Sequence, residues 1–333
     1  MHRFSSMVRN LRRGALLMLG GAAMLAWAPA TLAAWPERPI QMIVPFPAGS
    51  SPDTLARALA DPLSKKLGQA VVVENKPGAG GNIGTRQASK AKPDGYTLLL
   101  TINGPMVTAP TLYKKTLGYD PFTDLDPISL VGTSPNVLIV PENSPARDLQ
   151  GFVAAAKANP GALNYGTVGP GSSSHLCMAM LEHEAGIRLQ QIPYTGFPQI
   201  VTSIIAGDIQ AGFMVPGVAM PQVKAGKVRA LAITSLEPSD VLPGIPTVAS
   251  QGYPGFESIS WDALFVPAGT PADIKDKLHQ AVIEAIAQPE VVKQMAALYF
   301  TPAPSTPEEL MAMMKAEKQR WDAVINRLGL TLD

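Results

Sequence analysis

Hydroxyl-bearing and glycine residues follow predicted strands at several places in this 333-residue sequence, and they are its clearest candidates for chemistry. The first such stretch reads VPFPAGSSPDTLARALA, from Val44 to Ala60. An apolar run stops at prolines, and Ser51 as N-cap with Pro52 at the first helical position predicts a helix start. Free N–H groups at a helix start bind anions, and Ser50 and Ser51 add hydroxyl donors. An ordinary capped turn has the same pattern, so this stretch alone leaves both interpretations open.

Three further stretches repeat the pattern: TINGPMVTAP at 101–110, NYGTVGPGSSSHL at 164–176 and IPYTGFPQI at 192–200. Each follows the carboxyl end of a predicted strand, where open α/β sheets bind ligands. The residues singled out in them are Asn103, Gly171, Ser172, Ser173, His175, Tyr194, Thr195 and Gly196. None of the four turns contains Lys or Arg, which a polyphosphate would attract. The pattern therefore favours a small carboxylate, held by neutral amides and hydroxyls in a cleft.

Enzyme and metal chemistry find little support. The sequence has no Gly-x-Ser-x-Gly elbow, HExxH motif or paired CxxC, and the glycines of 78–84 miss the dinucleotide fingerprint. His175 and Cys177 are two residues apart and point to different faces of a helix. We therefore expect no catalytic residue, no metal and no cofactor. A secreted hydrolase that uses Ser172–Ser174 with His175 remains the enzyme alternative.

The N-terminus predicts export. Four arginines precede an apolar run at 14–28, and Thr31-Leu32-Ala33 has small residues suited to cleavage after Ala33, so residues 1–33 are interpreted as a signal peptide. These residues hold four of the 27 basic side chains and none of the 26 acidic ones, so the mature chain has a net charge of −3. That balance gives no electrostatic footprint for nucleic acid. Cys177, the only cysteine, lies in an apolar stretch and is expected to be a buried thiol.

Short β-like runs alternate with helical stretches over most of the chain, which predicts an α/β architecture with mainly parallel sheets. The expected strands are 40–46, 70–74, 97–101, 129–131, 137–140, 163–167, 191–194, 211–215, 229–234 and 258–266. Helices are expected after Ser51 and at 148–158, 173–185, 199–206, 271–287, 289–297 and 307–328. Pro62 predicts a kink or break in the first helix.

A loop-rich stretch at 237–256 indicates a boundary. Two crossings between α/β halves, near 132–137 and 257–262, make the first half discontinuous. We expect a lobe 1 formed by 34–134 plus 258–333, and a lobe 2 formed by 135–257.

Longer motifs carry a family resemblance. In order they are WPERPIQMIVPFPAG, GQAVVVENKPGAGGNIGT, KPDGYTLL, LNYGTVGPGSSSH, IPYTG, GKVRALAITS, LPGIPTVAS and PAGTP. Together they resemble the Bug-type extracytoplasmic solute receptors of tripartite tricarboxylate transporters, over about residue 35 to the end.

The resemblance implies a type II periplasmic binding-protein fold, whose two lobes are joined by crossing strands and close on a small carboxylate. It implies a periplasmic receptor that works as a monomer with two integral membrane transporter subunits. The family's binding loop matches Pro47 to Asp53, including Ala48 and Gly49, and the opposite wall matches Gly171 to His175 and Tyr194 to Gly196. A ligand-sensing module for a membrane sensor would have the same fold and stays an alternative.

Three departures bear on the ligand. The usual AGGGTD reads Ala48 to Asp53 as AGSSPD, Phe197 stands where a small residue is common, and Val215 stands where many members have aspartate. Val215 offers no anion to a ligand ammonium group, and Phe197 places an apolar ring beside a carboxylate loop. We expect a dicarboxylate with an apolar or aromatic middle, such as terephthalate, with an aliphatic dicarboxylate as the second choice.

Overall fold

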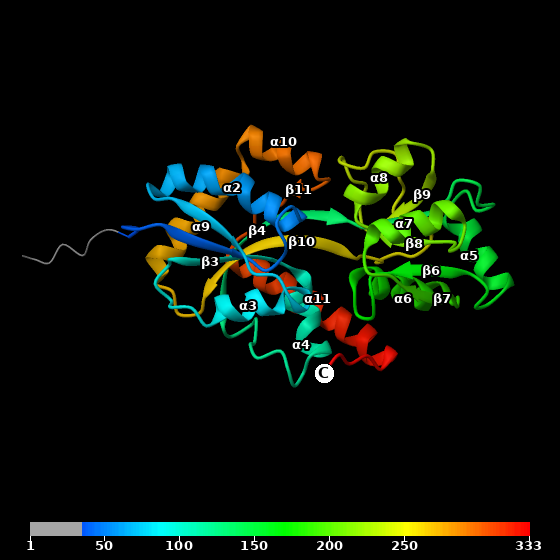
Figure 1. Ribbon diagram of the computed structural model, residues 1–333, viewed down its shortest axis with the longest axis horizontal. Coiled ribbons are helices and arrows are strands. Elements are labelled where there is room, and N and C mark those ends of the chain that lie inside the picture. Colours follow the sequence, from blue (N-terminus) through cyan, green and yellow to red (C-terminus); the bar gives the residue numbers. More distant parts are fainter. Residues whose placement is uncertain (1–34) are drawn as a thin grey trace, which may run out of the picture. The chain divides into compact units, whose positions relative to one another are not determined.

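The computed structural model describes residues 35–333; the predicted signal peptide, 1–33, lies outside the described residues. The chain divides into two units, Met1–Glu37 and Arg38–Asp333, and the fold given below is that of the second. Its elements form two groups, each built around a sheet, with β4 and β10 reaching from one group toward the other (Figure 1).

The first sheet has six strands in the order β11-β4-β10-β3-β1-β2. Its strands are β1 (Ile40–Val44), β2 (Val71–Asn75), β3 (Thr97–Ile102), β4 (Leu125–Pro135), β10 (Ile259–Pro267) and β11 (Thr301–Pro302). The helices of this group are α2 (Ser51–Leu67), α3 (Asn82–Ser89), α4 (Ala109–Leu112), α9 (Ala272–Ile286), α10 (Pro289–Ala297) and α11 (Pro307–Leu328). Short helical turns lie at Ala79–Gly81 and Gly104–Thr108.

The second group contains β5 (Val137–Pro141), β6 (Asn164–Thr167), β7 (Gln190–Pro193), β8 (Gly212–Met214) and β9 (Val228–Ile233). A three-stranded sheet, β8-β5-β9, and the pair β6-β7 are linked by a parallel bridge between Tyr165 and Ala211. The helices of this group are α5 (Leu149–Ala158), α6 (Ser173–Ala185), α7 (Phe197–Ala206) and α8 (Pro216–Lys224), and a short turn lies at Ala249–Gln251.

The expectation of mainly parallel sheets is wrong. Among the strands of residues 35–333, only β1-β2, β1-β3 and β6-β7 pair in parallel, whereas β4, β10 and β11 pair antiparallel in the first sheet, as do β5, β8 and β9 in the second. The physical reason is the double crossing between the groups. The chain leaves the first sheet along β4 and returns along β10, so these two neighbours must run in opposite directions.

The two crossings are held side by side by polar contacts. Asn136, between β4 and β5, donates its backbone N–H to Thr234 Oγ1 (2.8 Å) and its Nδ2 to the Ser258 carbonyl (3.1 Å). Thr234, which follows β9, donates its hydroxyl to that same carbonyl (2.6 Å). These crossings coincide with the segments expected near 132–137 and 257–262.

Side-chain alternation explains how the second sheet is buried. Along β5, Leu138 and Val140 face a core that includes α5 and α6, while Val137 and Ile139 face a core that includes α7 and α8. Successive side chains of a strand point to opposite faces, so an unbroken apolar run predicts a strand covered on both sides.

Helix α2 corrects two details. Its N-cap is Ser50 and not Ser51, so the predicted start is one residue late, and the side chain of Ser50 makes no capping bond. The helix also continues through Pro62, so of the predicted kink or break the break is wrong. Leu55, Leu59 and Leu63 are buried on its sheet-facing side, and this apolar packing offsets the hydrogen bond that proline cannot donate.

Candidate functional site

A cavity of about 500 Å³, called the cleft below, lies where loops of the first group meet loops of the second. The first group contributes the segments after β1 and β3, and the second contributes those after β6, β7 and β8. The lining residues used below are Phe46, Asn82, Asn103, Leu112, Asn136, Gly171, Ser172, Ser173, Phe197, Val215, Ser258, Ser260, Trp321 and Leu332. The sequence argument that several strand ends converge therefore describes the geometry of this cavity.

The start of α6 forms the second group's polar wall. Ser172 is the N-cap: its hydroxyl accepts from His175 N–H (3.3 Å) and donates to the Gly169 carbonyl (2.7 Å). It also contacts Ser174 Oγ at 3.1 Å, so the loop itself uses this hydroxyl. Ser173, the next residue, is exposed and lines the cleft with its hydroxyl unengaged by any residue the structure describes. Ser173 is thus the hydroxyl of this turn that is available to a ligand.

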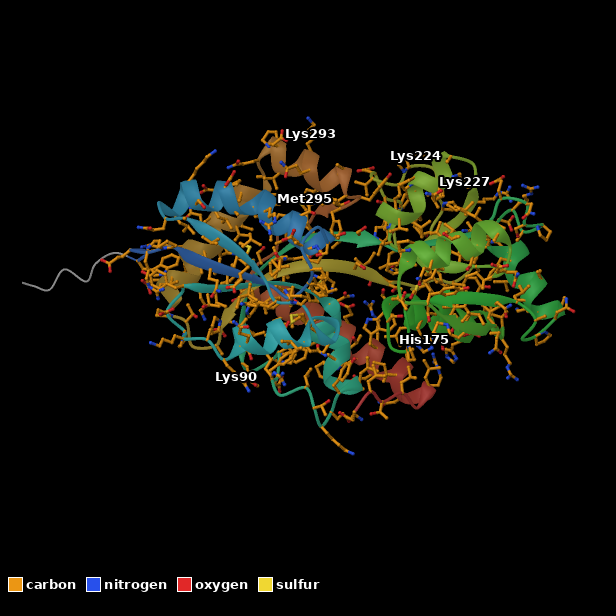
Figure 2. The ribbon with its side chains drawn as sticks, viewed as in Figure 1. Lys90, His175, Lys224, Lys227, Lys293 and Met295 are labelled. Carbon is orange, nitrogen blue, oxygen red and sulfur yellow. The ribbon has the colours of Figure 1, made fainter. Side chains whose placement is uncertain are left out.

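His175 supports the loop from behind. Its side chain lies in the first turn of α6 (Figure 2), is 6% exposed, and accepts the Gly171 backbone N–H at Nδ1 (3.0 Å). Burial lowers the pKa of His175, which favours the neutral ring that this acceptor role requires. Within residues 35–333 no serine hydroxyl bonds to the ring, so the base–nucleophile contact of a serine hydrolase is not formed.

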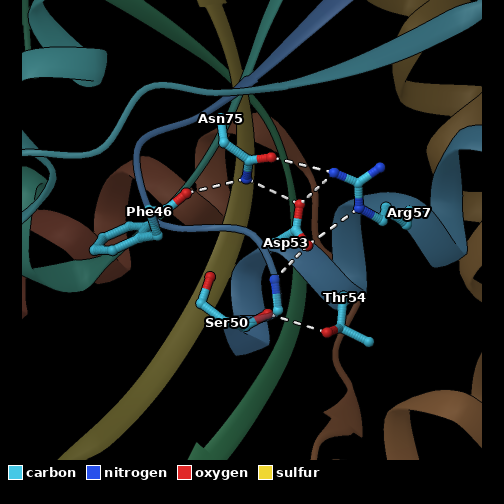
Figure 3. Close-up of polar contacts among 7 residues, drawn as sticks. Phe46, Ser50, Asp53, Thr54, Arg57 and Asn75 are labelled. Carbon is cyan, nitrogen blue, oxygen red and sulfur yellow. Dashed lines mark hydrogen bonds and ion pairs between the residues drawn. The ribbon is translucent and has the colours of Figure 1, made fainter.

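The loop before α2 is held by a carboxylate in the first turn of that helix, Asp53. Asp53 accepts the Gly49 N–H (2.8 Å), and its oxygens also contact Arg57 (Nε 3.1 Å, Nη2 2.9 Å) and Asn75 Nδ2 (2.9 Å), as Figure 3 shows. Burial acts to raise the pKa of Asp53, but the Arg57 guanidinium, the Gly49 amide and Asn75 outweigh it and hold the pKa below 3.8. The Asn75 amide also donates to the Phe46 carbonyl (3.0 Å). An internal anion therefore takes the Gly49 amide that the sequence offers to a ligand.

Of this loop only Phe46 lines the cleft. Ala48, Gly49 and Ser51 are exposed, while Ser50 Oγ is buried and has no hydrogen-bond partner among the described residues. Asp53, 2% exposed, faces its own network and not the cleft.

Residues of the segment after β7 line two different cavities. Phe197 lines the cleft, whereas Tyr194 and Thr195 line a separate, open depression beside α7. Thr195 donates its N–H (3.1 Å) and hydroxyl (2.7 Å) to Gln199 Oε1. Gly196 is the N-cap of α7 and lines neither cavity. The structure therefore brings together Asn103, Gly171, Ser172, Ser173, Phe197 and Val215 from the predicted set.

Several cleft residues escaped the sequence argument. Asn136, Ser258 and Ser260 come from the crossing strands, and Leu112 and Trp321 come from helices α4 and α11. Glu317, one turn before Trp321, lies beneath them and bonds to Asn103 although the two are 214 residues apart in sequence. In the sequence these residues lie in ordinary strand or helix patterns, which residues of the core also show.

All side chains that line the cleft are uncharged. A ligand carboxylate at the start of α6 would meet neutral hydrogen-bond donors and the dipole of that helix. Among residues 35–333, no three His, Cys, Asp or Glu side chains are grouped so that they could hold a metal ion. Cys177 is fully buried in the core, and burial raises the pKa of its thiol, as expected for a structural residue.

None of the helices in the described part of the chain is both long enough and apolar enough to span a membrane.

Comparison with known proteins gives the family. Residues 55–330 match the model of the tripartite tricarboxylate transporter family receptor. The chain is 36% identical to Protein BugT of Bordetella pertussis, over 92% of this chain and 94% of that protein. The solved structure of the periplasmic binding protein BugD is 36% identical and has a TM-score of 0.73, with 89% of this chain and 99% of that one covered.

Two solved relatives carry ligands. An R. palustris protein with adipate is 30% identical, with a TM-score of 0.77 over 89% of this chain and 99% of that one. MatC from Rhodopseudomonas palustris with bound malate is 31% identical, with a TM-score of 0.73 over 87% of this chain and 100% of that one.

These matches confirm the type II periplasmic binding-protein fold with two lobes, and they confirm a solute receptor in place of an enzyme. The chain belongs to the tripartite tricarboxylate transporter receptor family, the Bug-type solute-binding proteins.

Proposed function

We propose that this receptor binds a small dicarboxylate with an apolar or aromatic middle, in the periplasm, for delivery to two integral membrane transporter subunits. The observation that carries the proposal is the composition of the cleft. Its lining is uncharged, hydroxyl and amide groups gather at the start of α6 and along the crossing strands, and apolar side chains form the rest. Neutral donors at a helix start suit carboxylate oxygens.

The apolar part of the lining argues for the middle of the ligand. Phe46, Leu112 and Leu332 from the first group line the same cavity as Phe197 and Val215 from the second. A flat or extended hydrocarbon segment between two carboxylates would bury its surface there. The adipate found in one relative has such a middle, and terephthalate has an aromatic one. Val215 supplies no charge for a ligand ammonium group, so amino acids are disfavoured.

The proposed lobes are 34–134 plus 258–333, and 135–257. The paired crossings at Asn136 and Ser258 support these boundaries, because within residues 35–333 no sheet contains strands of both groups. Closure about the crossings would bring the loop of Ala48, Gly49, Ser50 and Ser51 toward Ser173. Asp53 would then act by holding that loop in shape, and Tyr194, Thr195 and Gly196 by positioning Phe197.

Family members are periplasmic, and the signal peptide predicted at 1–33 supports the same location for this chain. The receptor is proposed to act as a monomer.

Thermal unfolding in the presence of candidate ligands tests the proposal. Terephthalate, phthalate, adipate, succinate, citrate and glutamate are compared at equal concentration. A ligand at a hundredfold excess over its dissociation constant stabilises the folded state by roughly 2.7 kcal/mol. We expect terephthalate or adipate to raise the melting temperature most. A shift with glutamate or citrate alone would contradict the proposed ligand class, and chemical conversion of a bound ligand would contradict the receptor function.

A further inference from the structure

A buried carboxylate bonds to two residues of the cleft and itself borders a second cavity. Glu317, on α11, is 4% exposed, and three N–H groups donate to it: Trp261 Nε1 to Oε2 (2.5 Å), Trp321 Nε1 (3.0 Å) and Asn103 Nδ2 (3.2 Å) to Oε1. Two of these donors, Asn103 and Trp321, also line the cleft. Glu317 is thus an acceptor to every hydrogen-bond partner that the structure describes for it.

This carboxylate fixes which end of the Asn103 amide faces the ligand. Nδ2 of Asn103 donates to Glu317 and also to the Ile259 carbonyl (3.1 Å), so both of its hydrogens are engaged. Both partners are acceptors, and the opposite amide orientation would place Oδ1 against them. The atom left for the cleft is Oδ1, and no described residue donates to it.

Asn136 and Asn82 line the cleft without this constraint. Nδ2 of Asn136 donates to the Ser258 carbonyl (3.1 Å), which engages one of its two hydrogens, and Oδ1 of Asn82 accepts from the Tyr119 hydroxyl (3.1 Å), which leaves the Asn82 NH₂ group for other partners. The Asn103 oxygen is therefore a local acceptor in the cleft, while the start of α6 presents donors. A bare carboxylate suits the α6 end, but beside Asn103 Oδ1 it would place oxygen against oxygen.

Resting on the proposed function, we propose that Glu317 is a positioning residue that turns the Asn103 carbonyl oxygen toward the ligand. The receptor then selects a carboxylate that also carries a hydroxyl over the same carboxylate without it. A hydroxyl donates to Oδ1, whereas a ligand without a donor desolvates that oxygen and leaves it unpaired, which is unfavourable. Glu317 itself does not touch the ligand.

Substitution Glu317→Gln should weaken this preference. The glutamine NH₂ cannot accept a hydrogen bond; where it replaces Oε1, the Asn103 amide keeps only the Ile259 carbonyl as an acceptor and is held less firmly in one orientation. The size of the side chain is kept. Asn103→Ala removes the acceptor outright and provides a second variant if Glu317→Gln is poorly folded. Glu182→Gln is the control, because it removes the same charge from a carboxylate away from the cleft. The Glu182 side chain lies toward the C-terminal end of α6 and accepts the Leu189 N–H (2.7 Å).

Isothermal titration of purified protein with ligand pairs that differ by one hydroxyl provides the test. The pairs are succinate and malate, adipate and 3-hydroxyadipate, and isophthalate and 5-hydroxyisophthalate. In the wild type, the hydroxylated member of the pair that fits the cleft should bind about tenfold more tightly or better. In Glu317→Gln and Asn103→Ala the ratio should fall toward one, while Glu182→Gln keeps it.

Equal affinities within every pair for the wild type would overturn the inference and leave the carboxylate receptor intact. A folded Glu317→Gln that keeps the wild-type ratio would overturn the role of Glu317. If Glu317→Gln does not fold, Asn103→Ala tests whether the Asn103 oxygen sets the ratio, and an unchanged ratio there would overturn the inference. Absence of binding by any carboxylate would instead defeat the proposed function and this inference with it.

Discussion

The Asp53 carboxylate and the Arg57 guanidinium meet across one turn of α2, with Oδ1 and Nη2 2.9 Å apart, and the same carboxylate accepts the Gly49 N–H at 2.8 Å. The pair therefore joins the first turn of the helix to the loop before it (Figure 3). A loop of small residues gains a fixed shape from this one side chain, without a ligand.

Replacement of Asp53 by asparagine should destabilise the protein. The amide can still accept one bond, but the charged contacts with Arg57 are lost, and a buried hydrogen-bonded group contributes about 1–3 kcal/mol. Urea unfolding of both proteins measures the difference. The control is Glu284→Gln, which removes the charge of the exposed pair between Glu284 and Lys66 and should change stability much less than Asp53→Asn does.

The same pair should give a pH signature. The pKa of Asp53 is lower in the folded state than its ordinary value of 3.8, so the ionised form is favoured by folding. Its stabilising contribution is present above pH 3.8 and is lost as the pH falls through the folded-state pKa. The stability difference between wild type and Asp53→Asn should thus be constant near neutral pH and shrink below pH 4. A difference that grows on acidification would contradict the assignment.

Gly84→Ala should be costly although alanine favours helices. A Cβ at Gly84 in α3 would lie 2.6 Å from the Lys76 carbonyl oxygen and 2.8 Å from Pro45 Cβ, so the helix must shift away from the end of β1. Overpacking of this kind destabilises by about 1–3 kcal/mol. Gly217→Ala in α8 meets no atom within 4 Å and should be neutral or slightly stabilising. Unfolding midpoints in urea should separate the two variants clearly.

The two serines at the start of α6 should have separable effects. Ser172→Ala removes the N-cap hydroxyl and should lower stability by about 1 kcal/mol. Ser173→Ala removes an exposed hydroxyl from the cleft, so it should leave the melting temperature unchanged and weaken ligand binding by about 1 kcal/mol. Thermal unfolding and calorimetric titration of the same samples give both numbers. Unchanged affinity in Ser173→Ala would show that this hydroxyl does not bind the ligand.

Val215→Asp should change ligand selection. The new carboxylate would be the one charged side chain in the lining of the cleft, so it repels dicarboxylates and offers a partner to a ligand ammonium group. Affinity for adipate should fall at least about tenfold, which corresponds to about 1.4 kcal/mol. Binding of glutamate should improve. Val292→Asp, on the exposed side of α10, adds the same charge away from the cleft and should leave both affinities unchanged.

Much of the local structure followed from the sequence. Helix α6 begins at Ser173 and α11 runs from Pro307 to Leu328 as predicted, because serine and threonine caps, proline in the first turn and apolar periodicity are all local signals. The capping box of Thr306 and Glu309 is formed in the structure. Motifs along the whole chain indicated the family, and the family in turn predicted the fold.

Long-range pairing decided the rest. Sequence patterns do not state strand direction, so the antiparallel neighbours β4 and β10 were missed. The same limit applies to side-chain partners: the motif that proposed Asp53 for the ligand site did not indicate its contacts with Arg57 and Asn75.

The sequence by itself determined an α/β receptor with neutral, hydroxyl-bearing turns at several strand ends, because caps, turns and apolar runs act over a few residues. Only the tertiary structure decided which of those turns reach one cavity and which atoms they present to it. Asn103 illustrates the difference, because its amide is oriented by Glu317 from 214 residues away. The acceptor that faces the ligand follows from a buried carboxylate whose place in the fold no local pattern encodes.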